Sequence, residues 1–343
     1  DLMEEIARIY GYDRIPATQL AAGLPPQVGN RRLELEESIK DYLVGLGLQE
    51  IVTYRITSPE AESRLFPTRE LEAADYVRLA NPITSDKTVL RQNLLSNALE
   101  IVEKNSRNRK RIAIFEIGPV FIPPEDQADL PEEQSQLVLA VTGQRQPASW
   151  QDGEAGQMDF YDLKGVLERL ADELHLESLR FVPVEHESFH PGKCAAVYSG
   201  EVKLGVMGEI HPLVRDQYDL LDAPLLAAEF KLDSLIQTVP GLFEIEPIPV
   251  QPPVLEDLAI VVDEHIPARE VEDLIRQTGG SILADLRLFD VYRGKQVGSE
   301  KKSLAYSLIY QNPERTLTDK EVASIRKSIV TRLQKELGAS LRS

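Results

Sequence analysis

Two neighbouring stretches near the end of the chain alternate between apolar and other side chains with a period of two, the period of a β-strand. They cover residues 287–294 and 301–310, and a glycine-bearing stretch joins them, which predicts an antiparallel strand pair. One side of the second strand is apolar and suits a core, whereas the other side is mostly small. The two sides are Leu304, Tyr306, Leu308 and Tyr310, and Ser303, Ala305, Ser307 and Ile309.

The first strand of this pair is expected to present an acid and an aromatic side chain on an open face. Phe289 and Val291 suit the core, which would turn Asp290 and Tyr292 outward beside the small side chains. Such a face suits an unstacked nucleic-acid base, which needs a ring to stack on and an acceptor for its edge. A solvated sheet face with an incidental tyrosine fits the same pattern, so periodicity alone leaves both interpretations open.

The strand pair lies within a segment whose elements follow the order β-α-β-β-α. Thr318 and Glu321 form a capping box at the start of its last helix. With a fourth edge strand, the order becomes the βαββαβ pattern of ferredoxin-like domains. The other predicted elements are a strand at 258–262, a helix at 267–280, a helix at 318–338 and the edge strand at 341–343.

Upstream of a proline-rich stretch at 238–253, helices and strands alternate, which predicts a mixed α+β domain on a largely antiparallel sheet. The expected strands are 50–56, 76–79, 112–121, 136–142, 195–198, 202–208 and 226–231, and the expected helices are 31–47, 96–104, 160–174 and 212–218. Fold class α+β is therefore expected for both parts of the chain.

The first residues form an amphipathic helix that we expect to end at Gly11. Asp1, Glu4 and Glu5 place three carboxylates within about one turn and a half, which could supply oxygen ligands to a divalent cation. An acidic helix start that complements the helix dipole explains the same residues without a metal.

Composition narrows the class of protein. At 343 residues with a hydrophobic content of 42% and no apolar run of about 20 residues, a soluble cytoplasmic protein without a membrane span is expected. A single cysteine, Cys194, excludes an intrachain disulfide framework. The start at Asp1, within a helix, suggests a piece of a longer protein.

From residue 251 onward 14 Lys plus Arg balance 14 Asp plus Glu, so the preceding residues carry the whole net charge of −18. Any RNA contact is therefore expected in the C-terminal part.

Motifs for catalysis are missing from the sequence: it has no glycine-rich phosphate loop, nucleophile elbow or cysteine-rich metal site. The basic cluster Arg107, Arg109, Lys110 and Arg111 suits either a solvated helix end or a nucleic-acid contact.

Three sets of motifs, in order along the chain, resemble the C-terminal part of the β subunit of bacterial phenylalanyl-tRNA synthetase. Residues 1–16 resemble the end of its B5 domain. The middle of the chain resembles its catalytic-like domain, and the C-terminal segment resembles its ferredoxin-fold anticodon-binding domain. The motifs are Asn81-Pro82, Val89-Leu90-Arg91, Phe115-Glu116-Ile117-Gly118 and Gly208-Glu209-Ile210-His211-Pro212 for the middle, and residues 288–294, 302–305 and 315–319 for the end.

The resemblance implies a class II synthetase-like antiparallel sheet domain followed by the ferredoxin-like domain. The implied boundaries are 1–25 for the end of B5 and a connector, 26–240 for the catalytic-like domain, 241–250 for a linker and 251–343 for the anticodon-binding domain. The arginine that holds ATP in active class II enzymes is missing after Phe121, so no catalytic residue is expected here. The family's editing site lies upstream of Asp1. The implied partners are tRNA(Phe) and the catalytic α subunit in an α₂β₂ heterotetramer, which as a whole uses ATP.

Residue by residue, the resemblance places the family's anticodon contacts on Asp290, Tyr292 and Ser303. It also implies Mg²⁺ shared with the α subunit, at Asp1, Glu4 and Glu5, although the family's upstream carboxylate is missing. Phosphate contacts are expected from basic residues outside any apolar pattern, namely Arg293, Lys295, Lys301, Lys302 and Arg315.

Two other functions compete with this one. A ferredoxin-like small-molecule regulatory domain on a degenerate enzyme scaffold has the same βαββαβ order, but it would bind ligands through loops and tolerate loss of Tyr292. An active ATP-dependent ligase is disfavoured by the missing arginine.

Overall fold

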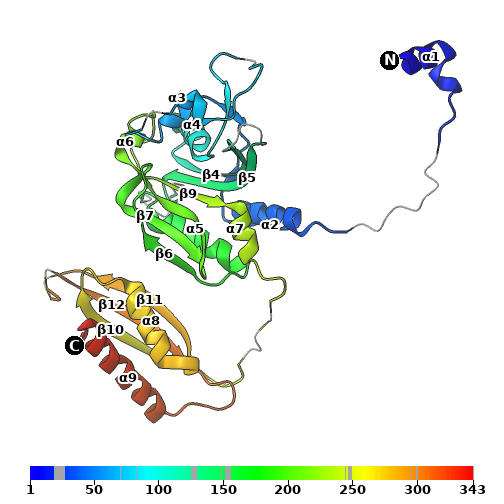
Figure 1. The fold of residues 1–343 in the computed structure, drawn as a ribbon. Coiled ribbons are helices and arrows are strands. Elements are labelled where there is room, and N and C mark those ends of the chain that lie inside the picture. Colours follow the sequence, from blue (N-terminus) through cyan, green and yellow to red (C-terminus); the bar gives the residue numbers. More distant parts are fainter. Residues whose placement is uncertain are drawn as a thin grey trace. The chain divides into compact units, whose positions relative to one another are not determined.

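In the computed structural model the chain divides into two compact units, Asp1–Phe243 and Glu244–Ser343 (Figure 1). The structure describes residues 1–343 except 19–27, 70, 83, 125–129, 148, 151–155, 244, 246–248, 295, 299 and 343. Each unit has its own hydrophobic core.

The first unit is built on a sheet with strand order β1-β4-β5-β9-β8-β7-β6. Strand β1 pairs parallel to β4, and every other neighbouring pair in this sheet is antiparallel. The strands are β1 (Gln49–Glu50), β4 (Arg111–Ile122), β5 (Glu132–Gly143), β6 (Leu179–Pro183), β7 (Phe189–Ser199), β8 (Val202–Ile210) and β9 (Leu225–Lys231). The largely antiparallel sheet predicted from the sequence is therefore present.

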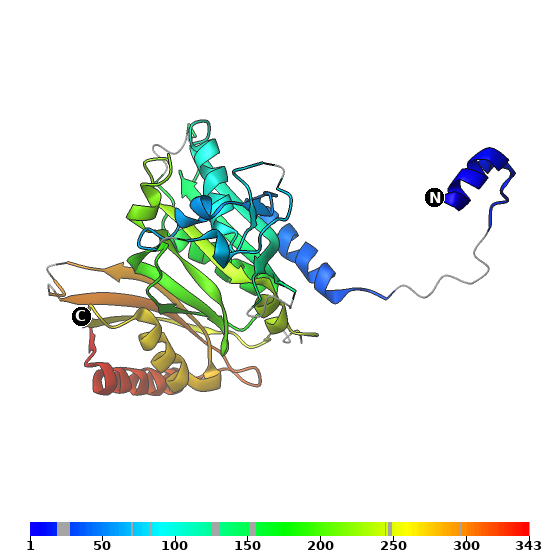
Figure 2. The same ribbon diagram turned by 45° about the horizontal axis from the view of Figure 1, so that its top comes forward.

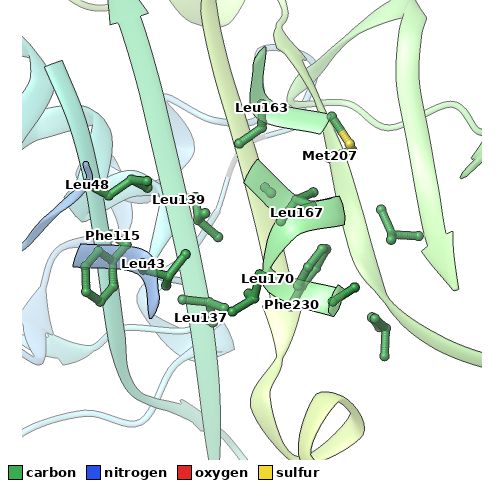
Figure 3. Packing of buried hydrophobic residues seen from close by; sticks show 14 of the residues in the cluster. Leu43, Leu48, Phe115, Leu137, Leu139, Leu163, Leu167, Leu170, Met207 and Phe230 are labelled. Carbon is green, nitrogen blue, oxygen red and sulfur yellow. The ribbon is translucent and has the colours of Figure 1, made fainter. Parts of the chain in front are cut away.

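Both faces of this sheet are covered, which explains why its central strands read as nearly continuous apolar runs. In β5, Leu137 and Leu139 pack with α2 (Arg31–Gly45) and α5 (Phe160–Glu173), whereas Val138 packs toward the opposite core. Figure 3 shows the leucines of α5 (Leu163, Leu167 and Leu170) beside those strands. The opposite core includes residues of α4 (Leu95–Ser106) and α6 (Pro212–Arg215).

Several smaller elements complete the first unit. They are α1 (Leu2–Tyr10), β2 (Ile56–Thr57), α3 (Pro59–Ser63), β3 (Val89–Leu90) and α7 (Leu232–Thr238). Gly11 has a φ of 99° after α1, as expected of the residue that ends this helix. Ser58 caps α3 by accepting from the Ala61 amide at 3.2 Å.

Two strand predictions about these elements were wrong. Of the strand expected at 50–56, only Glu50 in β1 and Ile56 in β2 lie in paired strands, and the strand expected at 76–79 is reduced to an isolated bridge between Arg78 and Val89. Strand β6 and helix α7 were not predicted. High strand propensity at Ile51, Val52 and Thr53 did not suffice, because a strand also needs a neighbour with free backbone groups.

The second unit has the strand order β11-β12-β10-β13, with antiparallel pairing throughout. Its elements are β10 (Val254–Asp263), α8 (Ala268–Gly279), β11 (Leu283–Tyr292), β12 (Lys301–Tyr310), α9 (Asp319–Leu337) and β13 (Ser340–Leu341). Figures 1 and 2 show both helices against one face of the sheet. The predicted ferredoxin-like fold is confirmed, including the edge strand.

The helices cover the apolar side of β12, as its alternation predicts. Leu304, Tyr306, Leu308 and Tyr310 are buried in the core with residues of both helices. Ala305, Ser307 and Ile309 are partly buried on the side that carries no helix, which is called the open face below. None of the helices in the described parts of the chain is long and apolar enough to cross a membrane.

Candidate nucleic-acid interface

The open face of the second unit carries the predicted acid and aromatic side chains. Asp290 pairs with Ala305 and Tyr292 pairs with Ser303 across the β11–β12 ladder. The prediction that Asp290 and Tyr292 lie beside small side chains is therefore confirmed. The carboxylate of Asp290 is exposed and makes no hydrogen bond or ion pair with any described residue.

A β-bulge in β11 sets this orientation. Leu286 and Leu288 pair with the buried Leu308 and Tyr306, but the register shifts between Leu288 and Asp290. In a regular strand Asp290 would follow Leu288 onto the core side. The extra residue reverses the sides, so Asp290 and Tyr292 reach the open face.

The same bulge shows that the core placement predicted for Phe289 was wrong, whereas Val291 lies on the predicted side but is not buried. Phe289 is the extra residue at the bulge, and it is 53% exposed. Val291 does pair with the buried Leu304, yet it remains 39% exposed at the end of an edge strand. Alternation gave the correct side for Val291 but could not show that the helices leave it uncovered.

The ring of Tyr292 is held between a glycine and an arginine. A Cβ atom added at Gly294 would lie 2.4 Å from the Tyr292 hydroxyl oxygen, so only glycine leaves room for this ring position. The Arg342 guanidinium carbon lies over the ring, 4.6 Å from its centroid. Arg342 was not singled out from the sequence, because its signal is a single basic residue after the short edge strand.

Ser303 lies deeper than predicted. It is only 1% exposed, and its hydroxyl oxygen has no hydrogen-bond partner. Buried hydroxyl groups normally find a hydrogen-bond partner, so the donor and the acceptor of the Ser303 hydroxyl are left unused beneath the open face.

The basic residues predicted to contact phosphate differ in their availability. Arg293 pairs with Glu264 at 2.9 Å and Lys301 with Asp263 at 3.3 Å, and both lysine and arginine side chains remain about half exposed. Arg315 binds the Glu321 carboxylate at 2.5 Å, and this contact holds the pKa of Glu321 down to about 2. Lys295 lies outside the described residues.

The prediction that Lys302 stands free for phosphate was wrong. Lys302 is 8% exposed, and its ammonium donates to the Glu264 carbonyl oxygen at 2.8 Å. Its position in β12 explains this result, because Lys302 shares the side of Leu304 and Tyr306, which faces the core.

In the first unit, two of the recognised motifs meet in a buried ion pair. Arg91 donates to the Glu116 carboxylate at 2.9 Å, with both side chains almost fully enclosed. Thr53 accepts from Arg91 at 2.7 Å and donates to Glu116 at 2.6 Å. A Cβ at Gly118 would lie 2.5 Å from the guanidinium, so this glycine makes room for Arg91. Arg91 and Glu116 thus satisfy each other inside the protein.

The motif at residues 208–212 also has a structural explanation. A Cβ at Gly208 would lie 2.5 Å from the Lys193 carbonyl oxygen on the neighbouring strand. His211 accepts from the Leu213 amide at 3.1 Å and caps α6, where Pro212 occupies the first turn. Cys194 is buried, and burial raises the pKa of its thiol to about 11, which opposes a role as a nucleophile.

The residues of the basic cluster after α4 differ in what they contact. Arg107 pairs with Asp219 at 2.7 Å. Arg109 and Arg111 line a cavity of about 280 Å³ together with Asn105.

Comparison with known proteins identifies the family. Residues 15–232 match the family model described as the phenylalanyl tRNA synthetase beta chain CLM domain, and residues 249–342 match the ferredoxin-fold anticodon binding domain. The chain belongs to the phenylalanyl-tRNA synthetase β-chain family. The resemblance inferred from the motifs is thereby confirmed.

Relatives within this β-chain family match along the whole of this chain. It is similar to the phenylalanine–tRNA ligase beta subunits of Clostridium tetani (37% identical over 344 residues), Geobacillus kaustophilus (38% over 349) and Symbiobacterium thermophilum (37% over 344). All of this chain is covered, and it spans 42%, 42% and 38% of the length of these relatives.

The acidic residues at the start of this β-chain segment do not form a ligand group by themselves. Glu5 accepts from Arg8 at 2.6 Å. Across the residues that the structure describes, no three His, Cys, Asp or Glu side chains are grouped so that they could hold a metal ion. Asp1, Glu4 and Glu5 would therefore need further oxygen ligands from outside this group.

Proposed function

We propose that this chain is the part of a phenylalanine–tRNA ligase β subunit that binds the anticodon region of tRNA(Phe) through the open face of its second unit. The observation that carries the proposal is the bulged hairpin, which places Asp290 and Tyr292 side by side on that face. Tyr292 offers a ring for stacking, and the unpaired Asp290 carboxylate can accept from the N1 and N2 hydrogens of a guanine. The anticodon-binding match of residues 249–342 supports the same assignment.

Binding of the full chain to a tRNA(Phe) anticodon stem-loop tests this proposal. Tyr292→Ala should weaken binding by roughly tenfold, within the range of about 1–3 kcal/mol for base–aromatic stacking, and Tyr292→Phe should retain most of the affinity. Asp290→Asn should weaken binding by a similar factor, because an amide oxygen accepts but the amide nitrogen opposes the second donor.

Asp285→Asn is the matched control for the carboxylate. Asp285 lies on the same strand and pairs with Ile309, at the far end of the hairpin from Asp290. If Tyr292→Ala and Asp290→Asn both bound the stem-loop like the unmodified chain, the assignment of this face to RNA would be wrong.

The proposal extends to the assembly. As the relatives are named beta subunits, we infer that this chain docks on a catalytic α subunit, within an α₂β₂ heterotetramer that uses ATP. Two large side chains that follow edge strand β1, Val52 and Tyr54, are 89% and 73% exposed, which suits a protein contact.

Asp1, Glu4 and Glu5 would share Mg²⁺ with the α subunit, which would have to supply the remaining oxygen ligands. Arg91 and Glu116 are buried and bind each other, which favours a structural rather than a catalytic role for the first unit.

The alternative of a small-molecule regulatory domain is not favoured. The ferredoxin-like order fits it equally well, but residues 249–342 match an anticodon-binding domain. The side chains that the bulge exposes also lie on the sheet face rather than on loops.

A further inference from the structure

A cavity of about 500 Å³ lies in the first unit, where helix α5 begins beside strands β6, β7 and β8. Its apolar lining comes from the first two residues of α5, Phe160 and Tyr161, and from the end of β6, Phe181 and Pro183. Cavities of this size that are mostly apolar and hold a few polar groups are typical of small-molecule sites. All the lining residues belong to the first unit, so the tRNA contacts proposed for the second unit do not use this cavity.

An irregular segment of strand β7 borders the cavity. Strand β7 pairs with β8 at Phe189 and again at Cys194, and only Glu209 lies between the two partner residues in β8. Residues 190–193 therefore lie opposite a single residue and leave the regular ladder. Gly192, with a φ of 87°, allows the chain to turn within this segment. Such bulges re-aim side chains and are frequent next to active sites.

The bulge brings two opposite charges together in the cavity wall. The Lys193 ammonium donates to the Glu209 carboxylate at 2.6 Å, and these side chains remain 49% and 20% exposed. Ion pairs open to solvent stabilise a protein little, so a ligand can separate the two groups at low cost. The third charged residue of the lining, Asp159, is already engaged. It accepts from the Tyr161 amide at 2.8 Å and pairs with Arg145 at 3.3 Å.

We propose that this cavity binds a small zwitterion with an aromatic ring, the chemistry of a free aromatic amino acid. The α-carboxylate of the ligand accepts from Lys193, and its α-ammonium donates to Glu209. The ring packs among the aromatic side chains of the lining. Each member of the ion pair exchanges one opposite charge for another, so neither is left buried without a partner.

Other classes of ligand fit this lining less well. A ligand with a single charge would separate the ion pair but satisfy only one of its members. An uncharged ligand would leave the pair in place and use only the apolar walls. A ring suits those walls because aromatic groups attract one another edge to face, as Phe160 and Tyr161 already do with centroids 5.8 Å apart.

Titration of the full chain with four small molecules, followed by NMR, tests the proposal. L-tryptophan carries a ring and both charges, whereas tryptamine lacks the carboxylate, indolepropionate lacks the ammonium and glycine lacks the ring. L-tryptophan should bind saturably. Each of the other three should bind at least about tenfold more weakly, because it lacks one charge-assisted hydrogen bond or the ring contact.

Two variants of the ion pair show which charge of the ligand meets which side chain. Lys193→Met should bind L-tryptophan no better than tryptamine, because the carboxylate has lost its partner. Glu209→Gln should remove the preference for L-tryptophan over indolepropionate, because the ammonium has lost its own. Lys104→Met is the control, since Lys104 pairs with Glu100 on helix α4, outside the cavity lining. It should keep both preferences.

Tyr161→Ala tests the aromatic wall separately from the charges. Tyr161 is 75% exposed, so this variant should keep its fold by circular dichroism, yet it should bind L-tryptophan several-fold more weakly.

Three results would overturn the proposal. The first is a lack of saturable L-tryptophan binding. The second is equal binding of L-tryptophan, tryptamine and indolepropionate, since the ion pair would then play no part. The third is loss of both preferences in Lys104→Met, which would separate the effect from Lys193 and Glu209. None of them bears on tRNA binding, because the cavity lies wholly within the first unit.

Discussion

Glu62 is a carboxylic acid that the first unit encloses almost completely. Its side chain accepts from the Gln92 amide at 2.9 Å, the Asn93 side chain at 2.8 Å and the Tyr76 hydroxyl at 3.1 Å. Burial outweighs these donors and raises the pKa of Glu62 from 4.5 to about 7, with a smaller contribution from the nearby Glu229. The folded protein therefore holds a proton that the unfolded chain releases.

This proton makes stability depend on pH with a defined sign. The contribution of Glu62 is fully present below about pH 4.5 and is lost as the pH rises through about 7. We expect the unfolding free energy of the first unit to fall by on the order of 2–3 kcal/mol between these limits. Glu62→Gln should flatten the dependence, as measured by urea denaturation across this range.

Glu60→Gln is the control for this substitution, because Glu60 lies two residues away in the same helix but is exposed. It should leave the pH dependence unchanged. Identical pH profiles for Glu62→Gln and the unmodified chain would show that Glu62 does not hold the proton.

At the scale of single elements, strand β11 decides what the open face presents. Its alternation changes sides at Phe289, because two residues of β11 there occupy the place of one. Inserting one alanine between Phe289 and Asp290 should place the alanine opposite Ala305 and move Asp290 opposite the buried Leu304, because the bulge already holds its one extra residue. We expect such an insertion to lower stem-loop affinity by at least about tenfold, since both the stacking ring and the acceptor leave the face.

Phe289→Ser is the matched variant, because it keeps the bulge while removing an aromatic ring that is already 53% exposed. Its affinity should stay close to that of the unmodified chain, and circular dichroism would verify that both variants fold. Retained binding after the insertion would mean that the side of β11 on which Asp290 and Tyr292 lie does not decide RNA binding.

The elements also show how far sequence patterns reach. The sides of β12, the capping box at Thr318 and the βαββαβ order followed from periodicity and cap chemistry. The bulge did not, because a sequence shows the residues of a strand but not which partner residue each one meets. Lys302 and Leu304 are two residues apart and therefore lie on the same side of β12. This spacing, which the sequence shows, indicates that Lys302 is buried.

At the scale of the whole molecule, the N-terminal and C-terminal parts of the chain differ in net charge. The residues before 251 carry the net charge of −18, whereas the rest is neutral. An acidic first unit repels nucleic acid, so RNA contact is favoured at the second unit and protein contact at the first. The sequence showed this division, but it could not show which apolar side chains of the first unit stay exposed.

Val52 offers a direct test of the proposed docking on an α subunit. At 89% exposure it contributes little to the core, so Val52→Asp should leave the stability of this chain nearly unchanged. Burying the new carboxylate in an interface would be unfavourable, and co-purification with a co-expressed α subunit should fall by at least about tenfold. Val28→Asp is the control, because Val28 is also 85% exposed. Full recovery of the complex with Val52→Asp would place the contact elsewhere.

The bulge at Phe289 has a consequence for how this chain can vary. The side on which Asp290 and Tyr292 lie is set by their pairing with Ala305 and Ser303, not by the chemistry of residue 289. That position should therefore accept many side chains in a mutational scan, and even its deletion should leave Asp290 opposite Ala305. A residue inserted after it should not be tolerated, because Asp290 would then lie opposite Leu304.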